Sequence, residues 1–139
     1  MGKYDELISF IPQLQGDNFG EWVKDRTNDG SPEHPKHFSF VRYSKDVMDL
    51  IDTIYEFSNN HPEFELKNYR ELLEKHGIEW GMRSMESADT SKLDGQTVMA
   101  LLVGALRAER FSDGTLLEFL ESGTILKWIE RLKTISESE

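Results

Sequence analysis

The sequence predicts one mainly α-helical domain built around a central buried helix, and three observations support this. The first is a set of apolar residues at the spacing of one helical face: Val98, Leu101, Leu102, Ala105 and Leu106. The second is that Met99 and Val103 lie off that face, so the helix is apolar on several sides. The third is the length of 139 residues, which suits a single domain over 1–139 with a sizeable core.

The central helix is predicted over about residues 95–110. Asp94 precedes it and can cap it, because its side chain can accept a backbone N–H that the first turn leaves unpaired. Gly104 lies in the middle of the helix, where glycine costs about 1 kcal/mol relative to alanine. We therefore expect a neighbouring helix to approach closely at Gly104.

The N-terminal part is predicted to be less regular. Residues 4–14 have helical spacing, and Pro12 lies near the end, where the helix should stop. Residues 16–37 are predicted to form an irregular loop rich in turn residues, with a short helix through Phe19, Trp22 and Val23. Residues 38–43 alternate aromatic and polar side chains, which predicts extended chain packed against helices and at most a minor strand.

Two helices are predicted between this part and the central helix. Ser44 is a good cap for a helix over 45–57, which carries a regular apolar stripe. A second helix over 69–76 is followed by Gly77, a residue that often ends helices. Residues 78–93 are predicted to be a connection, mostly polar after residue 84.

Two further helices are predicted after the central one, over 115–121 and 125–135, with a tight turn between them. Ser112 or Asp113 is the predicted cap of the first. The last residues, 136–139, are predicted to be a frayed tail.

Composition excludes several classes of function. The net charge of −10 and the pI near 4.9 argue against nucleic acid and anionic membrane surfaces as partners, because both attract basic proteins. The chain has no cysteine, which excludes disulfides, thiolate zinc sites and a cysteine nucleophile. The sequence shows no basic-then-apolar leader pattern and no run approaching about 20 apolar residues. We therefore expect a cytoplasmic protein.

The most distinctive local feature is the turn after the central helix, over residues 107–114. One interpretation is that Glu109, Arg110 and Asp113 line a shallow polar site, with Tyr43 as a further member. The other interpretation is structural, with Arg110 forming an ion pair that holds the helix junction together.

Four short runs in the C-terminal part form a pattern: Val98-Met-Ala-Leu-Leu, Arg107-Ala-Glu-Arg-Phe-Ser-Asp-Gly114, Leu120-Glu-Ser-Gly123 and Ile129-Glu-Arg-Leu132. Through these runs, and through Trp22, Tyr43-Ser44 and Val47, the chain resembles a family of small bacterial proteins of unknown function. The family is marked by Glu-Arg-Phe followed by Asp-Gly, and the resemblance covers most of the chain. It implies a mainly helical domain and brings no activity, cofactor or catalytic residue with it.

Other candidate sites rest on weaker patterns. Aromatic residues of the N-terminal part either form an interaction patch or pin the loop to the core: Phe19, Trp22, Phe38 and Phe40. Glu33, His34 and His37 have the chemistry of zinc ligands, but Pro35 prevents a helical display, so we predict a solvated loop and no metal site. The sequence has no glycine-rich phosphate loop and no Gly-x-Ser-x-Gly turn, and we predict no cofactor.

We expect a non-enzymatic module that binds another protein in the bacterial cytoplasm, through the aromatic patch or the turn over 109–114. The alternative is a small ligand-binding protein or enzyme, in which Arg110 orients an anionic group and a carboxylate acts as the base. A third hypothesis is DNA binding through the last two helices, using Lys127, Arg131 and Lys133. Nearby glutamates oppose it, and the sequence leaves the oligomeric state open.

Overall fold

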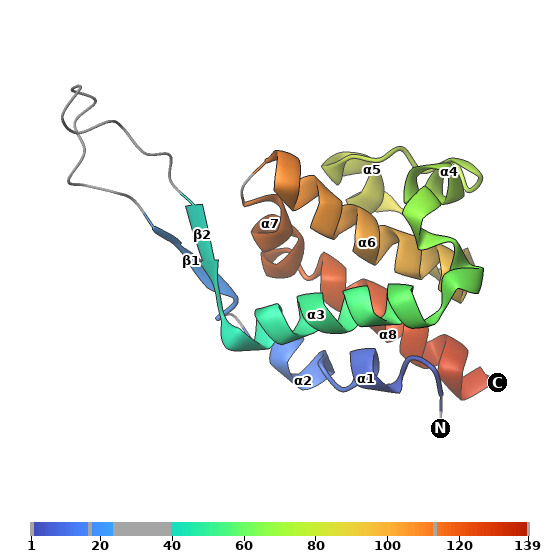
Figure 1. Ribbon diagram of the computed structural model, residues 1–139, viewed down its shortest axis with the longest axis horizontal. Helices are drawn as coiled ribbons and strands as arrows, with labels where there is room; N and C mark the ends of the chain where they lie inside the picture. The colour runs from blue at the N-terminus through green and yellow to red at the C-terminus, as the bar shows by residue number, and fades with distance from the viewer. Residues whose placement is uncertain (1, 17, 24–39, 113, 139) are drawn as a thin grey trace.

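Helix α6 (Gly95–Phe111) runs through the middle of the helical part of the molecule (Figure 1). This computed structural model describes residues 2–16, 18–23, 40–112 and 114–138. Every residue of α6 from Thr97 to Leu106 is buried, which confirms the predicted central helix. Its N-cap is also confirmed, because the Asp94 carboxylate accepts the Thr97 backbone N–H at 2.9 Å and the Thr97 hydroxyl at 2.6 Å.

Three side chains from other segments pack closely on α6 at Gly104. A Cβ placed there would lie 3.2–3.4 Å from side-chain atoms of Tyr69, Trp80 and Met85. The Trp80 indole N–H also donates to the Gly104 carbonyl oxygen at 2.9 Å. The close approach predicted at Gly104 is therefore present, and it is made by three side chains.

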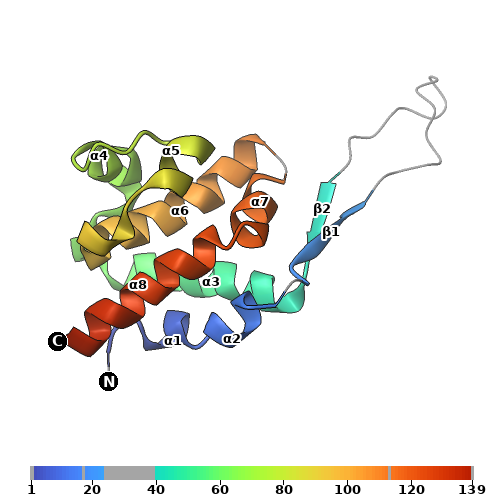
Figure 2. The same cartoon turned by 180° about the vertical axis from the view of Figure 1, so that it is seen from behind.

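The other helices pack around α6 or against helices that do. They are α1 (Asp5–Ile8), α2 (Ile11–Leu14), α3 (Lys45–Asn60), α4 (Tyr69–Glu74), α5 (Met82–Ser87), α7 (Thr115–Glu121) and α8 (Thr124–Ser138). Short 3₁₀ turns link them, namely η1 (Pro62–Phe64), η2 (Leu66–Asn68) and η3 (Thr90–Lys92). The predicted mainly helical fold is thus confirmed, and α3, α4, α7 and α8 all contact α6. Figure 2 shows α8 crossing in front of α6 in the view from behind.

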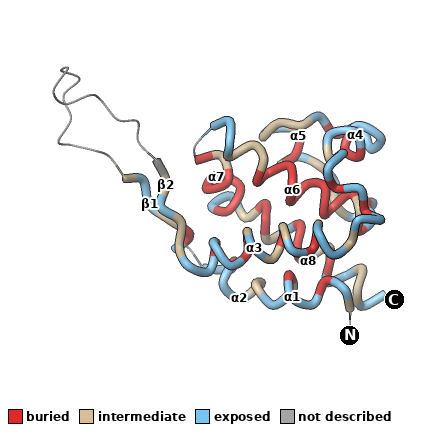
Figure 3. Tube along the Cα trace, viewed as in Figure 1, coloured by how far each residue is buried: buried red, intermediate tan, exposed pale blue. Residues whose placement is uncertain are grey.

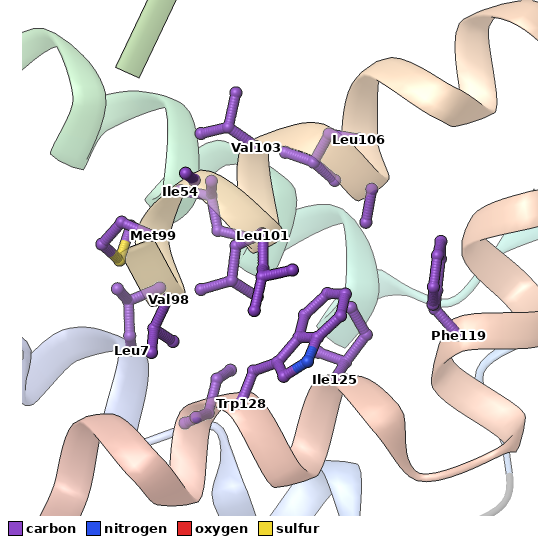
Figure 4. Packing of buried hydrophobic residues seen from close by; sticks show 14 of the residues in the cluster. Leu7, Ile54, Val98, Met99, Leu101, Val103, Leu106, Phe119, Ile125 and Trp128 are labelled. Carbon is purple, nitrogen blue, oxygen red and sulfur yellow. The ribbon is translucent and has the colours of Figure 1, made fainter. Parts of the chain in front are cut away.

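The core lies between α6 and these helices. Figure 4 shows Trp128 and Ile125 of α8, Phe119 of α7 and Ile54 of α3 directed towards α6. The Trp128 and Phe119 side chains are fully buried, and their ring centroids lie 5.4 Å apart. Figure 3 shows the same division, with buried chain concentrated in α6 and exposed chain along the outer faces of α1, α2 and α3. No helix within the described ranges is both long enough and apolar enough to cross a bilayer.

The helix predicted over 4–14 is wrong in one respect, because the chain forms two short helices, α1 (Asp5–Ile8) and α2 (Ile11–Leu14). Pro12 lies in the first turn of α2. A proline is tolerated there because the first turn has no intrahelical partner for its backbone N–H. The proline therefore starts the second helix and does not end the first.

The helix predicted through Phe19, Trp22 and Val23 is also wrong. Residues Gly20–Val23 form strand β1, which pairs antiparallel with β2 (Phe40–Tyr43) in a register that places Trp22 opposite Val41. The extended chain predicted over 38–43 is present as β2, and its pairing with β1 was not foreseen. Figure 1 shows this hairpin projecting from one end of the helical part.

Two expectations for the connections need correction. The predicted connection over 78–93 contains the short helix α5, anchored by the buried Met85, and the turn η3. The predicted frayed tail continues α8 as regular helix up to Ser138. The predicted helix over 45–57 begins where expected, with the Ser44 hydroxyl accepting the Val47 N–H at 3.3 Å, and extends three residues further.

Candidate functional site

The junction between α6 and α7 contains the predicted polar site, and Glu109 holds it together. The Gly114 N–H donates to both carboxylate oxygens of Glu109, at 3.0 and 3.2 Å, and the Leu116 N–H donates to one of them at 3.0 Å. Gly114 is the N-cap of α7 and has no side chain that could cap the helix. A carboxylate from the preceding helix therefore caps α7, where its negative charge also suits the helix dipole.

Tyr43 reaches the same helix end from strand β2. Its hydroxyl oxygen accepts the Leu117 N–H at 3.1 Å. The Thr115 N–H donates to the Ser112 carbonyl oxygen at 3.2 Å. The first three N–H groups of α7 are thus all paired, through one local carbonyl and two distant side chains.

The hairpin rests on this junction through one face. Side chains alternate across a strand, so Trp22 and Tyr43 share a face of the β1–β2 ladder. The Trp22 ring lies directly against Gly114, and a Cβ at Gly114 would lie 2.7 Å from Trp22 Cη2. Glu21 and Arg42 lie on the opposite face, where they form an exposed ion pair at 3.8 Å.

The structure brings Glu109 and Tyr43 together at the α7 N-terminus, and Arg110 does not join them. Arg110 is exposed, and within the described part of the chain no ion pair involves it. Asp113 lies outside the described residues, so both interpretations of Arg110 stay predictions. The cap predicted at Ser112 is wrong, since the N-cap of α7 is Gly114 and the side chain that caps it is Glu109; Asp113, the alternative cap, lies outside the described residues.

The aromatic residues of the predicted interaction patch lie in different environments. Phe19 is buried in the core, and the Trp22 side chain is 49% exposed above Gly114. Phe40 is the β2 residue opposite Val23, and Phe38 lies outside the described residues. Of the patch side chains that the structure describes, Phe19 is part of the core and Trp22 is a half-exposed ring that packs on the α6–α7 junction.

A second set of side chains lies at the C-terminal end of α6. Phe111 is 78% exposed, and its ring meets Trp80 edge-on with the centroids 5.7 Å apart. The Arg70 guanidinium lies over the Trp80 ring, 4.4 Å from its centroid. Tyr69 packs edge-on against Trp80 at 5.8 Å, so the indole is held by two rings, a cation and its own hydrogen bond to Gly104.

Arg107 completes this second set. It lies one turn before Phe111 on the same face of α6, because residues four apart in a helix are neighbours. We refer to Arg70, Trp80, Arg107 and Phe111 as the arginine–aromatic surface. Sequence reasoning missed it, because its members come from α4, α6 and the segment before α5, and no spacing rule connects these elements.

The described part of the chain contains no group of three His, Asp or Glu side chains arranged to hold a metal ion. The sequence predicts no metal site at Glu33, His34 and His37. These three residues lie outside the described residues. Among the described residues, His61 Nδ1 lies 3.0 Å from Glu63 Oε2. Backbone hydrogen bonding first, and His61 second, hold the pKa of Glu63 below its ordinary value.

Comparison with models of protein families finds a match over nearly the whole chain. The model of a family of unknown function (DUF6508) matches residues 2–138. No curated protein and no solved structure matches the chain.

Proposed function

The chain belongs to this family of unknown function, and we propose that it is a protein-interaction module that binds its partner through the arginine–aromatic surface. The observation that carries the proposal is Phe111, which exposes 78% of its side chain although it is anchored against Trp80. Among the described residues it is the most exposed large hydrophobic side chain. We take this aromatic ring, which is left in water beside a fixed indole, as the centre of the binding surface.

The proposal is supported by the apolar area that binding would cover and by the fixed position that the neighbouring indole already has before binding. Covering a phenylalanine side chain contributes about 1.5–3 kcal/mol through the hydrophobic effect. Trp80 is already fixed by its hydrogen bond to Gly104 and by the Arg70 guanidinium, so binding loses little conformational entropy at this residue. Arginine and tryptophan are also the residue types most enriched among side chains that dominate interface energies.

The setting we propose is the bacterial cytoplasm. The support is the absence of cysteine and the resemblance to small bacterial proteins. A binding module also fits a chain whose charge keeps it soluble while Phe111 stays exposed.

The proposal is tested by capture of partners from a bacterial lysate on immobilised wild-type chain, Phe111→Ala and Met48→Ala. Met48 is the matched control, because it is a 49% exposed apolar residue on α3, a different helix. We expect a protein that is retained by wild type and by Met48→Ala and lost with Phe111→Ala, at unchanged melting temperature. Equal retention by all three chains contradicts the proposal.

Two other hypotheses stay predictions. For a ligand-binding protein or enzyme with a polar pocket over 107–114, a thermal-shift screen with nucleotides, sugars and small carboxylates is the test. Ligand at 100 times its Kd raises the free energy of unfolding by about 2.7 kcal/mol. For DNA binding, two of the three cations considered already contact protein carbonyls, since Lys127 donates to Glu86 at 3.0 Å and Arg131 to Leu93 at 3.0 Å.

A further inference from the structure

We propose that the outer edge of strand β1 binds an extended segment of another protein, which adds to the hairpin as a third strand and carries a basic residue opposite Glu21. This surface is separate from the arginine–aromatic surface, and the proposal does not rest on the proposed function. The register of the β1–β2 ladder carries it, because that register directs backbone groups of Gly20 and Trp22 away from β2.

The hydrogen-bonding pattern of the hairpin follows from one contact at its base. The Ser44 N–H donates to the Phe19 carbonyl oxygen at 2.8 Å, so these two residues form a hydrogen-bonded pair. In an antiparallel ladder such pairs alternate with pairs that share no hydrogen bond. The next hydrogen-bonded pair on β1 is therefore at Glu21, and the N–H and C=O groups of Gly20 and Trp22 point outward.

These outward groups form an open edge. The sheet has two strands, and among the described residues no hydrogen bond outside the ladder involves the backbone of Gly20 or Trp22. Figures 1 and 2 show the hairpin projecting from one end of the helical part. The outward residues of β2 are Val41 and Tyr43, and Tyr43 is already engaged by α7. Outward N–H and C=O groups along a strand are complementary to an extended backbone, so the edge of β1 fits a further strand.

The short length of the hairpin also favours a third strand. Strands β1 and β2 have four residues each, and a two-stranded hairpin is only marginally stable by itself. Gly20 and Trp22 can each exchange two backbone hydrogen bonds with the residue opposite in an added antiparallel strand. Such a strand therefore satisfies the outward groups and extends the sheet without any change in the β1–β2 register.

The register also defines the side chains that the added strand should carry. The residue opposite Trp22 lies on the same face as the indole, which is 49% exposed, so a β-branched or aromatic side chain there covers part of it. The residue opposite Glu21 lies on the other face, beside an exposed carboxylate. Because opposite charges stabilise a cross-strand pair, lysine or arginine is favoured at that position. The net charge of −10 favours a basic partner as well.

A second copy of the chain fits this edge less well. Two antiparallel β1 strands engage both outward residues of each copy only when Gly20 of one copy pairs with Trp22 of the other. That register places Glu21 directly opposite the Glu21 of the second copy, in a pair without hydrogen bonds, where side chains are closest. Like charges in that position destabilise the pairing, so the observations favour a different protein.

The proposal is tested with peptides selected from a random twelve-residue library, displayed on phage, against the full chain. Synthetic copies are added to isotope-labelled protein, and amide hydrogen exchange is followed by NMR. In the free chain the Trp22 amide should exchange faster than the Glu21 amide, which is bonded to β2. We expect selected peptides to carry lysine or arginine between apolar residues and, at saturation, to slow exchange at Trp22 by about tenfold or more.

Variants then separate the backbone contact from the side chain. Trp22→Pro removes the outward N–H and the indole, whereas Trp22→Ala removes the indole alone. We expect the peptide Kd for Trp22→Pro to exceed that for Trp22→Ala about tenfold, which is the size of one lost backbone hydrogen bond. Val41→Pro and Val41→Ala are the matched pair on β2, where the N–H also points outward, and should give equal Kd values. Glu21→Gln should raise the Kd by up to about fivefold, and Phe111→Ala should leave it unchanged.

Several outcomes overturn the proposal. If no selected peptide slows exchange at Trp22, or if Trp22→Pro and Trp22→Ala bind equally, β1 is not the binding edge. Selected peptides that are acidic overturn the basic residue opposite Glu21. Peptides that lose binding with Phe111→Ala belong to the arginine–aromatic surface and support the proposed function in place of this one. A dimer in analytical ultracentrifugation that is lost with Trp22→Pro assigns the edge to a second copy.

Discussion

Replacing the half-buried Glu109 by alanine should destabilise the protein strongly. The side chain accepts the backbone N–H groups of Gly114 and Leu116, two residues that are themselves buried. A hydrogen bond to a charged group contributes about 1.5–3 kcal/mol, and a buried donor left unpaired costs about 1–3 kcal/mol. Partial rescue by water lowers the sum, and we expect a loss of about 2–4 kcal/mol in the free energy of unfolding.

This loss is measurable by thermal unfolding followed by circular dichroism. For a chain of 139 residues, 1 kcal/mol corresponds to about 3 °C in Tm. Glu109→Ala should therefore lower Tm by about 6–12 °C, and Glu109→Gln by roughly half of that, because the amide keeps one acceptor oxygen.

The matched control is Glu130→Ala, which removes an exposed glutamate from the middle of α8 and should shift Tm by less than about 2 °C. Equal shifts for Glu109→Ala and Glu130→Ala would refute the capping role of Glu109. A loss for Glu109→Gln as large as for Glu109→Ala would show that charge, and not the acceptor oxygen, is decisive.

Three further predictions concern the same architecture. Tyr43→Phe removes the acceptor of the Leu117 N–H and should lower the free energy of unfolding by about 1 kcal/mol in denaturant titrations. An unchanged midpoint would contradict the contact between the hairpin and α7. Gly114→Ala places a Cβ against Trp22 at a φ of +94°. The free energy of unfolding should therefore fall by at least about 1–2 kcal/mol, and the tryptophan emission should shift. Identical emission spectra would exclude the packing of Trp22 on Gly114. Burial of the Asp94 carboxylate opposes its ionisation, but hydrogen bonds from Thr97 outweigh this and lower its pKa below the ordinary value of 3.8. The ionised Asp94 therefore stabilises the fold above that pH, and this stabilisation is lost as pH falls through the lowered pKa. In urea titrations at several pH values, the difference in the free energy of unfolding between wild type and Asp94→Asn should shrink over this acid range.

The elements that sequence reasoning predicted well are those whose signals are local. Helices α3 and α6 each carry a capping residue immediately before an apolar stripe, namely Ser44 and Asp94. Both signals come from one continuous segment, so no knowledge of distant contacts is needed. The need for glycine at position 104 could be predicted as well, because its cost in a helix demands a compensating contact.

The N-terminal elements were predicted poorly, because they depend on a partner. Strand β1 has four residues, and its apolar side chains fit a short helix as well as a strand. Only its pairing with β2, about twenty residues further along the chain, decides between the two. Helices α1 and α2 both pack against α8, and the helical spacing of residues 4–14 does not reveal the break between them.

The candidate sites show the same limit. Capping rules look for the residue directly before a helix, and for α7 they point to Ser112 or Asp113. The actual cap is Glu109, at the end of the preceding helix. Tyr43 accepts a further N–H of α7 and belongs to a hairpin more than seventy residues before that helix. The contacts of Trp80 with Arg70 and Phe111 join three separate segments, and nothing in the order of residues along the chain indicates them.

Site-specific photo-crosslinking in bacterial cells tests the central claim most directly, namely that Phe111 lies in a protein interface. A photoreactive phenylalanine analogue is placed at position 111 in one chain and at position 48, on α3, in another. We expect a discrete covalent adduct with one partner from position 111, and no adduct from position 48. The absence of an adduct at position 111, or the same set of adducts from both positions, would contradict it.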